Sequence, residues 1–197
     1  MNKRQKCYLP FKRLIGIIGS VFGIFFCMTF IWWWITIINL FVTKGHPFFI
    51  SKRVGKNGKE FGLLKFRSMK AGVDPNLTSK HSTKDNLTKF GAFLRKSSLD
   101  ETLQLFNIFI GQMAFIGPRP LIDIDEDAIT VQKRKENGSI ALRPGISGYA
   151  QLHTRANLDC VQKADYDLYY FEHISLWFDI KVFTKTLFTF TRSNQGK

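Results

Sequence analysis

Residues 14–42 read "LIGIIGSVFGIFFCMTFIWWWITIINLFV", a stretch that contains no charged side chain. As one continuous α-helix it would be roughly 43 Å long, which exceeds the ~30 Å hydrocarbon core of a bilayer. A cleaved signal peptide is disfavoured, because the apolar part is too long and no small-residue cleavage site follows it. The stretch therefore predicts a membrane element, and the rest of the chain is expected to form a domain attached to that membrane.

Basic residues flank the apolar stretch on both sides. Because positive charge prefers the cytosolic side, both ends are expected in the cytosol, and only a bent, re-entrant segment satisfies both. We favour re-entry, and a single span remains the alternative. The bend is expected at Gly23 or at residues 27–29, where Thr29 can bond back to a carbonyl. The flanking residues are Lys3, Arg4, Lys6, Lys12 and Arg13 before the stretch, and Lys44, Lys52, Arg53, Lys56 and Lys59 after it.

The overall charge predicts an anionic partner. Lys and Arg number 29 against 15 Asp and Glu, which gives a net charge of +14. This balance fits a polyanion, an anionic membrane face or a phosphorylated substrate. Nucleic acid is disfavoured, because the basic residues are spread along the chain without a basic helix or an RNA-binding aromatic motif. The three cysteines are far apart and suggest no disulfide framework, so a reduced cytosolic setting fits best. No two histidines have metal-ligand spacing, which disfavours a histidine metal site.

Residues 44–197 are expected to form a cytosolic, membrane-associated domain after the membrane element of residues 1–43. Residues 48–54 and 60–66 alternate like two strands, and Asn57-Gly58 between them predicts a hairpin turn. Residues 70–89 are polar and predict a loop that could cover a site. The fold class is therefore α+β and mainly helical. Helices are expected over residues 87–95, 99–110, 123–137, 164–171 and 174–190, with extended chain over 113–121 and after the Pro-Gly turn of "LRPGISGYAQL". The last helix is either a core helix or one lying in the membrane interface.

Two neighbouring carboxylates, Asp100 and Glu101, stand in "SSLDETLQLFN", residues 97–107. One interpretation is a capping box, in which Ser98 caps a helix and Glu101 reaches back to it. The other is catalysis. A carboxylate at a helix N-terminus stays ionised, so Asp100 is available to attack phosphorus, and Glu101 could help hold Mg²⁺.

Catalysis on phosphate requires cations near this pair. "GPRP" fixes Arg119 between two prolines, which leaves its guanidinium little entropy to lose. Arg143 opens the rigid Pro-Gly turn. The other candidates are Lys65, Arg95 and Arg155. Each of these five is a candidate for binding substrate phosphate or nucleotide.

Five motifs together resemble the bacterial sugar transferases, the monotopic polyprenyl-phosphate sugar-1-phosphate transferases, over nearly the whole chain. They are "KR" before the membrane segment, "KFRSM", "LRKSSLDETLQLFNIFIGQMAFIGPRP", "LRPGISGYAQ" and "DLYYFEHISLWFDIKV". The resemblance implies a re-entrant membrane helix and a cytosolic catalytic domain on the inner face of a bacterial inner membrane. It also implies a Mg²⁺-dependent reaction that starts surface polysaccharide or glycoconjugate synthesis.

The resemblance further implies roles for single residues. Asp100 corresponds to the nucleophile that attacks the sugar-bearing phosphate of a UDP-sugar, releases UMP and carries a covalent phosphosugar. Polyprenyl phosphate is then the acceptor, and Glu101 supports the metal and the acid–base steps. Lys65, Arg95, Arg119 and Arg155 fall where the family contacts phosphate or nucleotide.

The chain departs from the family at three places. Gln112 and Ala114 replace the Asp and Ser of the usual "GDMS", no Ser-Pro bends the membrane segment, and Gly16 lies near the place of an Asp expected after "KR". Two other readings therefore remain beside the enzyme. One is a non-catalytic relative that binds nucleotide-sugar or lipid phosphate as a scaffold, and the other is a basic anchor protein.

Overall fold

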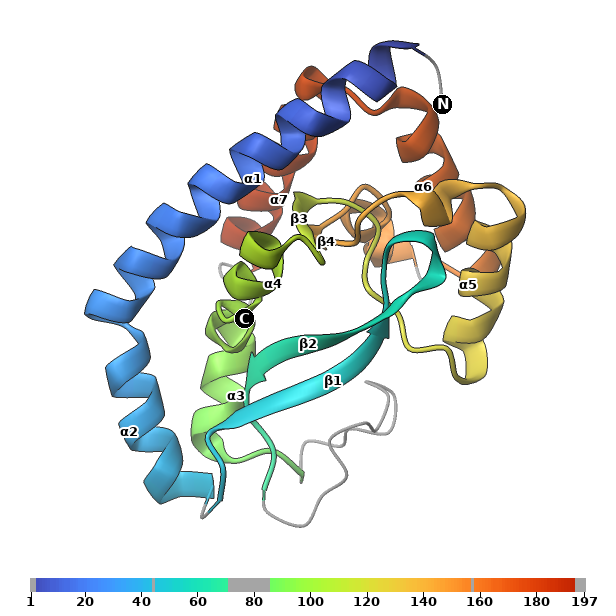
Figure 1. Ribbon diagram of the computed structural model, residues 1–197. Coiled ribbons are helices and arrows are strands. Elements are labelled where there is room, and N and C mark those ends of the chain that lie inside the picture. The colour runs from blue at the N-terminus through green and yellow to red at the C-terminus, as the bar shows by residue number, and fades with distance from the viewer. Residues whose placement is uncertain (1–2, 44, 71–85, 157, 194–197) are drawn as a thin grey trace.

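A computed structural model describes residues 3–43, 45–70, 86–156 and 158–193. A bent pair of helices forms one edge of the molecule, and the remaining elements fill the space inside that bend (Figure 1). The helices are α1 (Lys3–Phe30), α2 (Trp32–Thr43), α3 (Lys89–Lys96), α4 (Gln104–Ile110), α5 (Asp125–Glu136), α6 (Cys160–His173) and α7 (Leu176–Ser193). The strands are β1 (Phe48–Val54), β2 (Glu60–Phe66), β3 (Ala114–Ile116) and β4 (Gly145–Ser147). The α+β, mainly helical fold class is confirmed.

The membrane segment bends at Ile31, between α1 and α2. The backbone remains hydrogen-bonded through the bend, because Ile31 N donates to the Cys27 carbonyl at 3.0 Å and Ile35 N to the Ile31 carbonyl at 3.2 Å. Thr29 Oγ1 bonds back to the Phe25 carbonyl at 2.8 Å, as predicted for this stretch, and such back-bonding favours a bent helix. These bonds satisfy the backbone amides of Ile31 and Ile35 at the bend, where an unpaired amide would be costly in an apolar environment.

Neither predicted position is the bend itself, because α1 continues through Gly23 and through residues 27–29, and the bend follows at Ile31. Gly23 instead allows close packing: a Cβ there would lie 3.0 Å from Leu105 of α4. A Cβ at Gly19 would lie 2.8 Å from the Phe115 ring. The glycines of α1 thus face the soluble elements, and their small size lets the helix approach α4 and β3.

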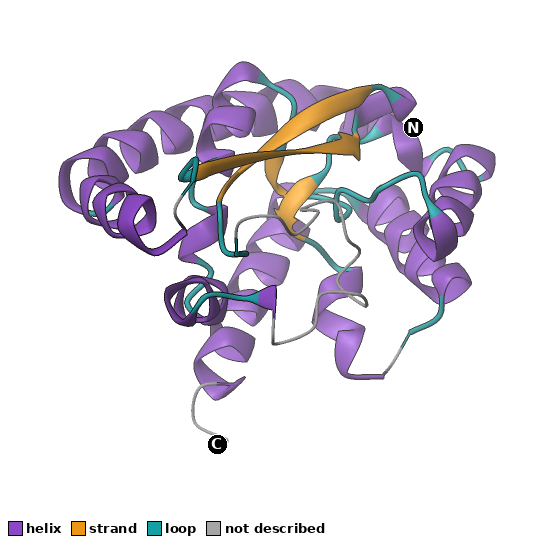
Figure 2. Cartoon of the chain, turned by 90° about the horizontal axis from the view of Figure 1, so that it is seen from below, coloured by secondary structure: helices purple, strands orange, loops and turns teal. Residues whose placement is uncertain are grey.

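The predicted hairpin is confirmed with its turn. β1 and β2 pair antiparallel, with Arg53 opposite Phe61 and Phe49 opposite Lys65. Asn57 and Gly58 both have positive φ, 56° and 75°, which Asn and Gly tolerate better than other residues. Figure 2 shows the hairpin crossing between helices on both sides.

The other helices match the predicted ones with shifted ends. Thr88 caps α3 by accepting from Gly91 N at 2.8 Å, so this helix begins two residues later than predicted. α6 begins earlier, at Cys160, because Asp159 forms a capping box with Gln162. The Pro-Gly turn leads into β4, which pairs parallel with β3. The predicted loop falls mainly on residues 71–85, which lie outside the described residues.

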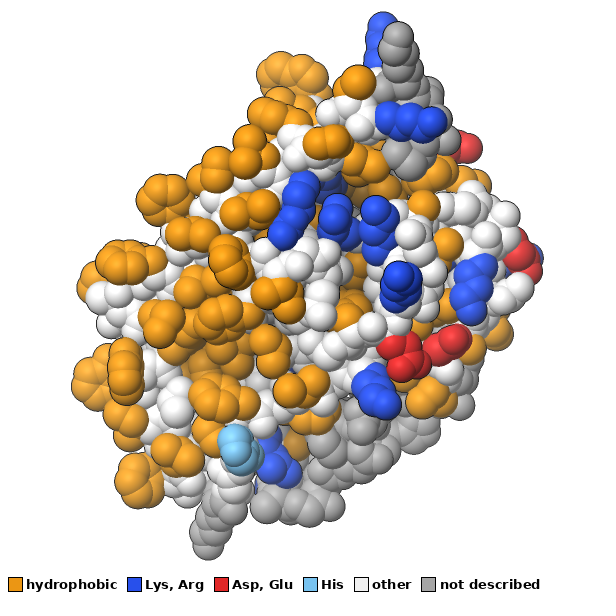
Figure 3. Space-filling view, viewed as in Figure 1, with side chains coloured by type: hydrophobic (Ala, Val, Ile, Leu, Met, Phe, Trp, Pro, Cys, Tyr) orange, Lys and Arg blue, Asp and Glu red, His pale blue; other side chains and the backbone are white. Residues whose placement is uncertain are grey.

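An apolar surface runs along α1 and α2 (Figure 3). Phe22, Phe25 and Phe41 are 71%, 72% and 79% exposed. The segment Arg4–Phe30 is long and apolar enough to cross a membrane. Large exposed apolar surfaces of this kind mark sites of membrane or protein contact. They support membrane association of the chain.

The last helix, α7, has two apolar faces. Val182 is buried in a core cluster with Tyr170 and Ile174 of the α6 region. Trp177 and Phe188 are 80% and 74% exposed. The helix thus combines the two alternatives left by its sequence: one face belongs to the core, and the other is an apolar surface suited to a membrane interface.

The start of α1 is bound to α6 and α7 by buried polar groups. Lys12 Nζ lies 2.7 Å from Asp179 Oδ2. Tyr8 donates to the same oxygen at 2.6 Å, and Tyr170 donates to Asp179 Oδ1. Gln5 Nε2 donates to the carbonyls of Phe171 and Glu172 at the end of α6. These bonds fix the membrane segment to the soluble part at its N-terminal end.

Candidate active site

The acidic pair lies on a single 3-10 turn, Leu99–Glu101, ahead of α4. The predicted helix over residues 99–110 is therefore wrong in its first turn, and so is the capping box. Ser98 has a positive φ of 55° and its side chain makes no cap bond. The turn is held instead by its apolar neighbours, since Leu99 and Leu103 pack into the cluster around Trp32, Phe66 and Leu94.

Glu101 is paired with Lys65 of β2. Lys65 Nζ donates to Glu101 Oε1 at 2.7 Å, and both side chains are mostly buried. Burial acts to raise the pKa of Glu101, but Lys65, Arg119 and Arg53 outweigh it, so this pKa is held below its usual value. Glu101 is therefore a stable anion whose position is set by a cation of β2.

Asn107 fixes β2 against α4, the helix that follows the acidic pair. Its Oδ1 accepts from Leu64 N at 3.0 Å, and its Nδ2 donates to the Gly62 carbonyl at 2.7 Å. Nδ2 also donates to Gln112 Oε1 at 2.6 Å. Gln112 thus supplies an oxygen acceptor that orients the Asn107 amide. In this chain Gln112 therefore has a structural partner in Asn107.

Asp100 is only 5% exposed. Burial raises its pKa to about 6, opposed first by Lys65; Glu101 adds to the rise, and Arg95 and a backbone hydrogen bond oppose it. Asp100 lies on a 3-10 turn and not at the N-terminus of a helix, so the predicted helix does not stabilise its charge. Desolvation dominates instead, but a pKa of about 6 still leaves the carboxyl group mostly ionised at pH 7, as expected, and makes it less solvated and more basic than an exposed aspartate.

Three of the five predicted cations act on the acidic pair. Lys65 and Arg95 act on Asp100, and Lys65 and Arg119 act on Glu101. Arg119 is exposed, and its carbonyl accepts from Arg134 Nη1 at 2.9 Å. Arg134 is itself buried and donates to Asp167 Oδ2 at 2.8 Å. The loop carrying Arg119 is thus held by a buried ion pair that sequence analysis did not identify.

Arg53 is a further cation of the site that sequence analysis missed. Burial and the charge of Arg119 lower its pKa, while Asp127 and Glu101 oppose that change. The strand register could have identified it, because residues paired around an Asn-Gly turn alternate with period two. Arg53 shares one face of the hairpin with Leu63 and Lys65. The acidic pair therefore faces four cations, which suits an anionic ligand.

The membrane bend contacts the same turn. Trp32, the first residue of α2, donates from Nε1 to Thr102 Oγ1 at 2.9 Å. Thr102 Oγ1 in turn donates to the Leu99 carbonyl at 2.8 Å. The Trp32 ring lies 5.2 Å from the Phe106 ring centroid. One tryptophan of "WWW" is thus buried beside the turn that carries the acidic pair, whereas Trp33 and Trp34 remain exposed.

The other two predicted cations are not brought to the acidic pair by any described contact. Arg143 donates from Nε to the Gly111 carbonyl at 2.8 Å, at the opposite end of α4. Arg155 lies in the 3-10 segment Ala150–Ala156, and its side chain falls outside the described part of the chain. Their assignment to substrate phosphate remains a prediction.

Mg²⁺ fits the two carboxylates, although they are few. Among the described residues, no group of three or more His, Cys, Asp or Glu side chains gathers. Mg²⁺ usually takes only one or two protein carboxylates and keeps waters and substrate phosphates as its other ligands. Asp100 and the second oxygen of Glu101 meet that requirement.

The sequence is similar to those of known sugar transferases over most of its length. The family model described as bacterial sugar transferase matches residues 7–193. An uncharacterized sugar transferase of Haemophilus influenzae is 38% identical over 161 residues, which cover 73% of this chain and 32% of that protein. The uncharacterized sugar transferase EpsL of Bacillus subtilis is 32% identical over 184 residues, covering 89% of this chain and 85% of EpsL.

A third relative has a named reaction. The UDP-glucose:undecaprenyl-phosphate glucose-1-phosphate transferase of Xanthomonas campestris is 36% identical over 151 residues, which cover 73% of this chain and 31% of the relative. The chain thus spans less than half the length of the Haemophilus and Xanthomonas proteins. The family match covers nearly every residue that builds the site, including both carboxylates and their cations. This chain belongs to the bacterial sugar transferase family.

Proposed function

We propose that the protein transfers a sugar-1-phosphate from a UDP-sugar to polyprenyl phosphate, such as undecaprenyl phosphate, and releases UMP. The observation that carries the proposal is a buried Asp100 beside the 2.7 Å Lys65–Glu101 ion pair, with Arg53, Arg95 and Arg119 around them. The named reaction of the Xanthomonas relative supplies the donor and acceptor classes.

The first step is an attack by Asp100. A carboxylate oxygen forms a bond to the sugar-bearing phosphorus, the bond between that phosphorus and the bridging oxygen breaks, and UMP leaves with the electron pair. Because Asp100 is desolvated, no water shell must be removed before the attack. The surrounding cations stabilise charge on the phosphate oxygens as the bond to UMP breaks.

The second step regenerates Asp100. An oxygen of polyprenyl phosphate attacks the phosphorus of the aspartyl phosphosugar, and the bond to the carboxylate breaks. The product is a polyprenyl diphosphate sugar, and Asp100 is again a free carboxylate. Glu101, held ionised by Lys65, orients groups around the reacting phosphate. Mg²⁺, held by Asp100, Glu101 and substrate phosphates, would supply charge neutralisation.

The membrane bend supports access to the lipid acceptor. Trp32 of the bend lies directly under the turn that carries Asp100. We therefore place the site at the cytoplasmic face of the inner membrane, where the re-entrant segment enters the bilayer and returns. A polyprenyl phosphate in that leaflet then reaches the site without leaving the membrane.

Purified full-length chain in detergent, given a panel of UDP-sugars, Mg²⁺ and polyprenyl phosphate, tests the proposal. UMP release with a preferred donor is expected, and it should be abolished by Asp100→Asn. The matched control is Asp165→Asn, which removes an exposed carboxylate of α6 and should leave the rate unchanged. Equal rates for the two variants, or binding of UDP-sugar without turnover by the unaltered chain, would refute the enzyme.

A further inference from the structure

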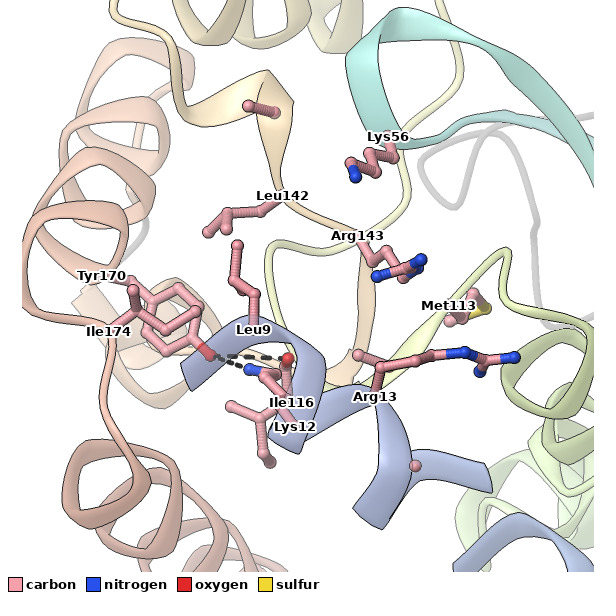
Figure 4. Close-up of a pocket in the computed structure, with 13 residues that line it drawn as sticks. Leu9, Lys12, Arg13, Lys56, Met113, Ile116, Leu142, Arg143, Tyr170 and Ile174 are labelled. Atoms are coloured by element: carbon pink, nitrogen blue, oxygen red, sulfur yellow. Dashed lines mark hydrogen bonds between the residues drawn. The ribbon is translucent and has the colours of Figure 1, made fainter. Parts of the chain in front are cut away.

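A second cationic site lies at the opposite end of α4 from Asp100. A cavity there is lined by Lys12 and Arg13 of α1, by Lys56 at the hairpin tip, and by Arg143 (Figure 4). Its remaining walls are largely apolar. They comprise Leu9, Met113, Ile116, Leu142 and Ile174, together with Gly16, Ala114, Ala141 and Tyr170.

Only one of these four cations has an acidic partner among the described residues. Lys12 is paired with Asp179. Arg13 donates to the carbonyls of Ile108 and Phe109. The described part of the chain gives neither Arg143 nor Lys56 an ion pair, so three positive charges in the cavity are not balanced by a carboxylate.

Capping of α4 does not account for this much charge. The C-terminal end of a helix carries at most roughly half a negative charge, and one arginine is enough to compensate it. Arg13 already binds two of the last carbonyls of α4. The terminal nitrogens of Arg143 make no hydrogen bond with described residues, and Lys56 is exposed. These donors are available to an anion.

The position of the cavity identifies the anion as part of a lipid. The seven residues of α4 span roughly 10 Å between the catalytic turn and this end, so a phosphate bound here is too far away to react at Asp100. Phe109 and Ile110, at this end of α4, are exposed, as are Phe11 and Leu14 of α1. In Figure 3, Lys and Arg side chains gather directly beside the apolar surface of α1. A headgroup bound to the cations can thus leave its acyl chains on that surface.

We infer that this cavity binds the phosphate headgroup of an anionic phospholipid, at a site separate from the acidic pair. Arg143 and Lys56 bind the phosphate oxygens, Arg13 contributes charge, and the apolar walls contact the glycerol and the first methylenes of the chains. The bound lipid would hold α1, α4 and the hairpin tip at a fixed depth in the membrane. This inference does not depend on the reaction proposed above.

Thermal unfolding of the full chain in zwitterionic detergent tests the site. The probes are dioctanoyl phosphatidylglycerol, dioctanoyl phosphatidylcholine and inorganic phosphate, each titrated separately. Phosphatidylglycerol should raise the midpoint temperature in a saturable manner, and phosphatidylcholine should not. Lys56→Glu should weaken the apparent Kd by about tenfold, because it reverses one charge at the headgroup. Arg143→Met should remove the saturable effect.

Lys52→Glu is the matched control, because Lys52 is an exposed lysine of the same hairpin that does not line the cavity. It makes the same charge change and should leave the apparent Kd unchanged. Lys56 has no described partner, so its substitution is not expected to disturb folding. Three results would overturn the inference: equal weakening by the two glutamate variants, equal stabilisation by the two lipids, or inorganic phosphate saturating at the concentrations that phosphatidylglycerol requires.

Discussion

The two ends of α4 both gather positive charge, but they hold it differently. Before α4, four cations surround Asp100 and Glu101, and Lys65 is paired with Glu101 at 2.7 Å. After α4, Arg13 and Arg143 donate to backbone carbonyls of the helix end, and Lys56 has no described partner. The first end thus contains a buried carboxylate, Asp100, among its cations. The described residues place no carboxylate in contact with Arg13, Arg143 or Lys56 at the second.

This difference separates binding from chemistry. Cations next to neutral carbonyls can attract a phosphate, but they offer no group that forms a bond to it. A desolvated carboxylate beside cations can do both, because the cations bind the phosphate and the carboxylate attacks it. The difference between the two ends of α4 therefore depends most on Asp100.

Asp100→Asn should reduce UMP release by at least about 10³-fold, since it removes the nucleophile. It should also stabilise the fold at pH 7. The raised pKa means that the native state binds this proton more tightly than the unfolded chain, so stability is lost as pH rises from the ordinary aspartate pKa of 3.8 to about 6. Because Asn carries no charge, the variant avoids this loss, and its free energy of unfolding at pH 7 should be higher by up to about 3 kcal/mol.

Chemical denaturation at several pH values measures the stability effect of Asp100→Asn. The gain should be present at pH 7 and should vanish below the unfolded-state pKa, where Asp100 is protonated in both states. The exposed Asp165→Asn serves as the reference. A variant that is inactive and also destabilised at pH 7 would mean that Asp100 holds the turn together instead of being strained by burial.

Lys65→Met should lower kcat/KM by about 10²-fold, because it removes both the partner of Glu101 and a cation at the phosphate. Steady-state kinetics with the preferred donor measure it. Lys52→Met is the matched control on the other face of the same hairpin. If the two variants lose equal activity, the Lys65–Glu101 pair has no role in the reaction.

The pH profile of the first step should fall about tenfold per unit below pH 6, as Asp100 becomes protonated. Arg95 opposes the rise in that pKa, so Arg95→Met should move the midpoint to higher pH. Lys96→Met, at the neighbouring position of α3, should leave the midpoint in place. A rate of the first step that stays constant between pH 5 and 8 would exclude Asp100 as the titrating group, because a carboxyl group with a pKa of about 6 titrates within that range.

Trp32→Phe should have the smallest effect, a loss of about 3–10-fold in kcat with KM unchanged, since it removes one hydrogen bond and keeps a ring. Thr102→Val should lose more, because it also removes the bond to the Leu99 carbonyl, and Thr102→Ser should retain the rate. The double variant Trp32→Phe/Thr102→Val should be no worse than Thr102→Val alone. Trp33→Phe, at an exposed position, is the control. Losses that multiply in the double variant would show that no shared bond links the membrane bend to the turn.

Local sequence patterns predicted the elements whose cause is local. Asn57-Gly58 and the alternation around it fix the hairpin, and the long apolar stretch fixes the membrane segment. The same patterns failed where contacts distant in sequence decide. Ser98 and Glu101 have the spacing of a capping box, but Glu101 binds Lys65, which lies 36 residues away in the chain. The spacing of residues within one segment cannot reveal a binding partner that is distant in the sequence.

The site residues follow the same division. Lys65, Arg95 and Arg119 were identified because each lies in a motif, and the strand register contained enough information to add Arg53. Trp32 could not be found in this way, because its neighbours in "WWW" are chemically identical and only the tertiary fold buries one of the three. The pKa of Asp100 was also beyond reach, since it depends on how deeply the turn is packed.

The central claim is that buried Asp100 carries the sugar phosphate during the reaction. The most direct measurement mixes the full chain with UDP-sugar labelled in its sugar and β-phosphate, without acceptor, quenches in acid and maps the label by mass spectrometry. The account predicts one sugar phosphate per chain, on the peptide containing Asp100, lost when polyprenyl phosphate is added and absent in Asp100→Asn. UMP formation in the presence of acceptor, with no label ever found on that peptide, would contradict it.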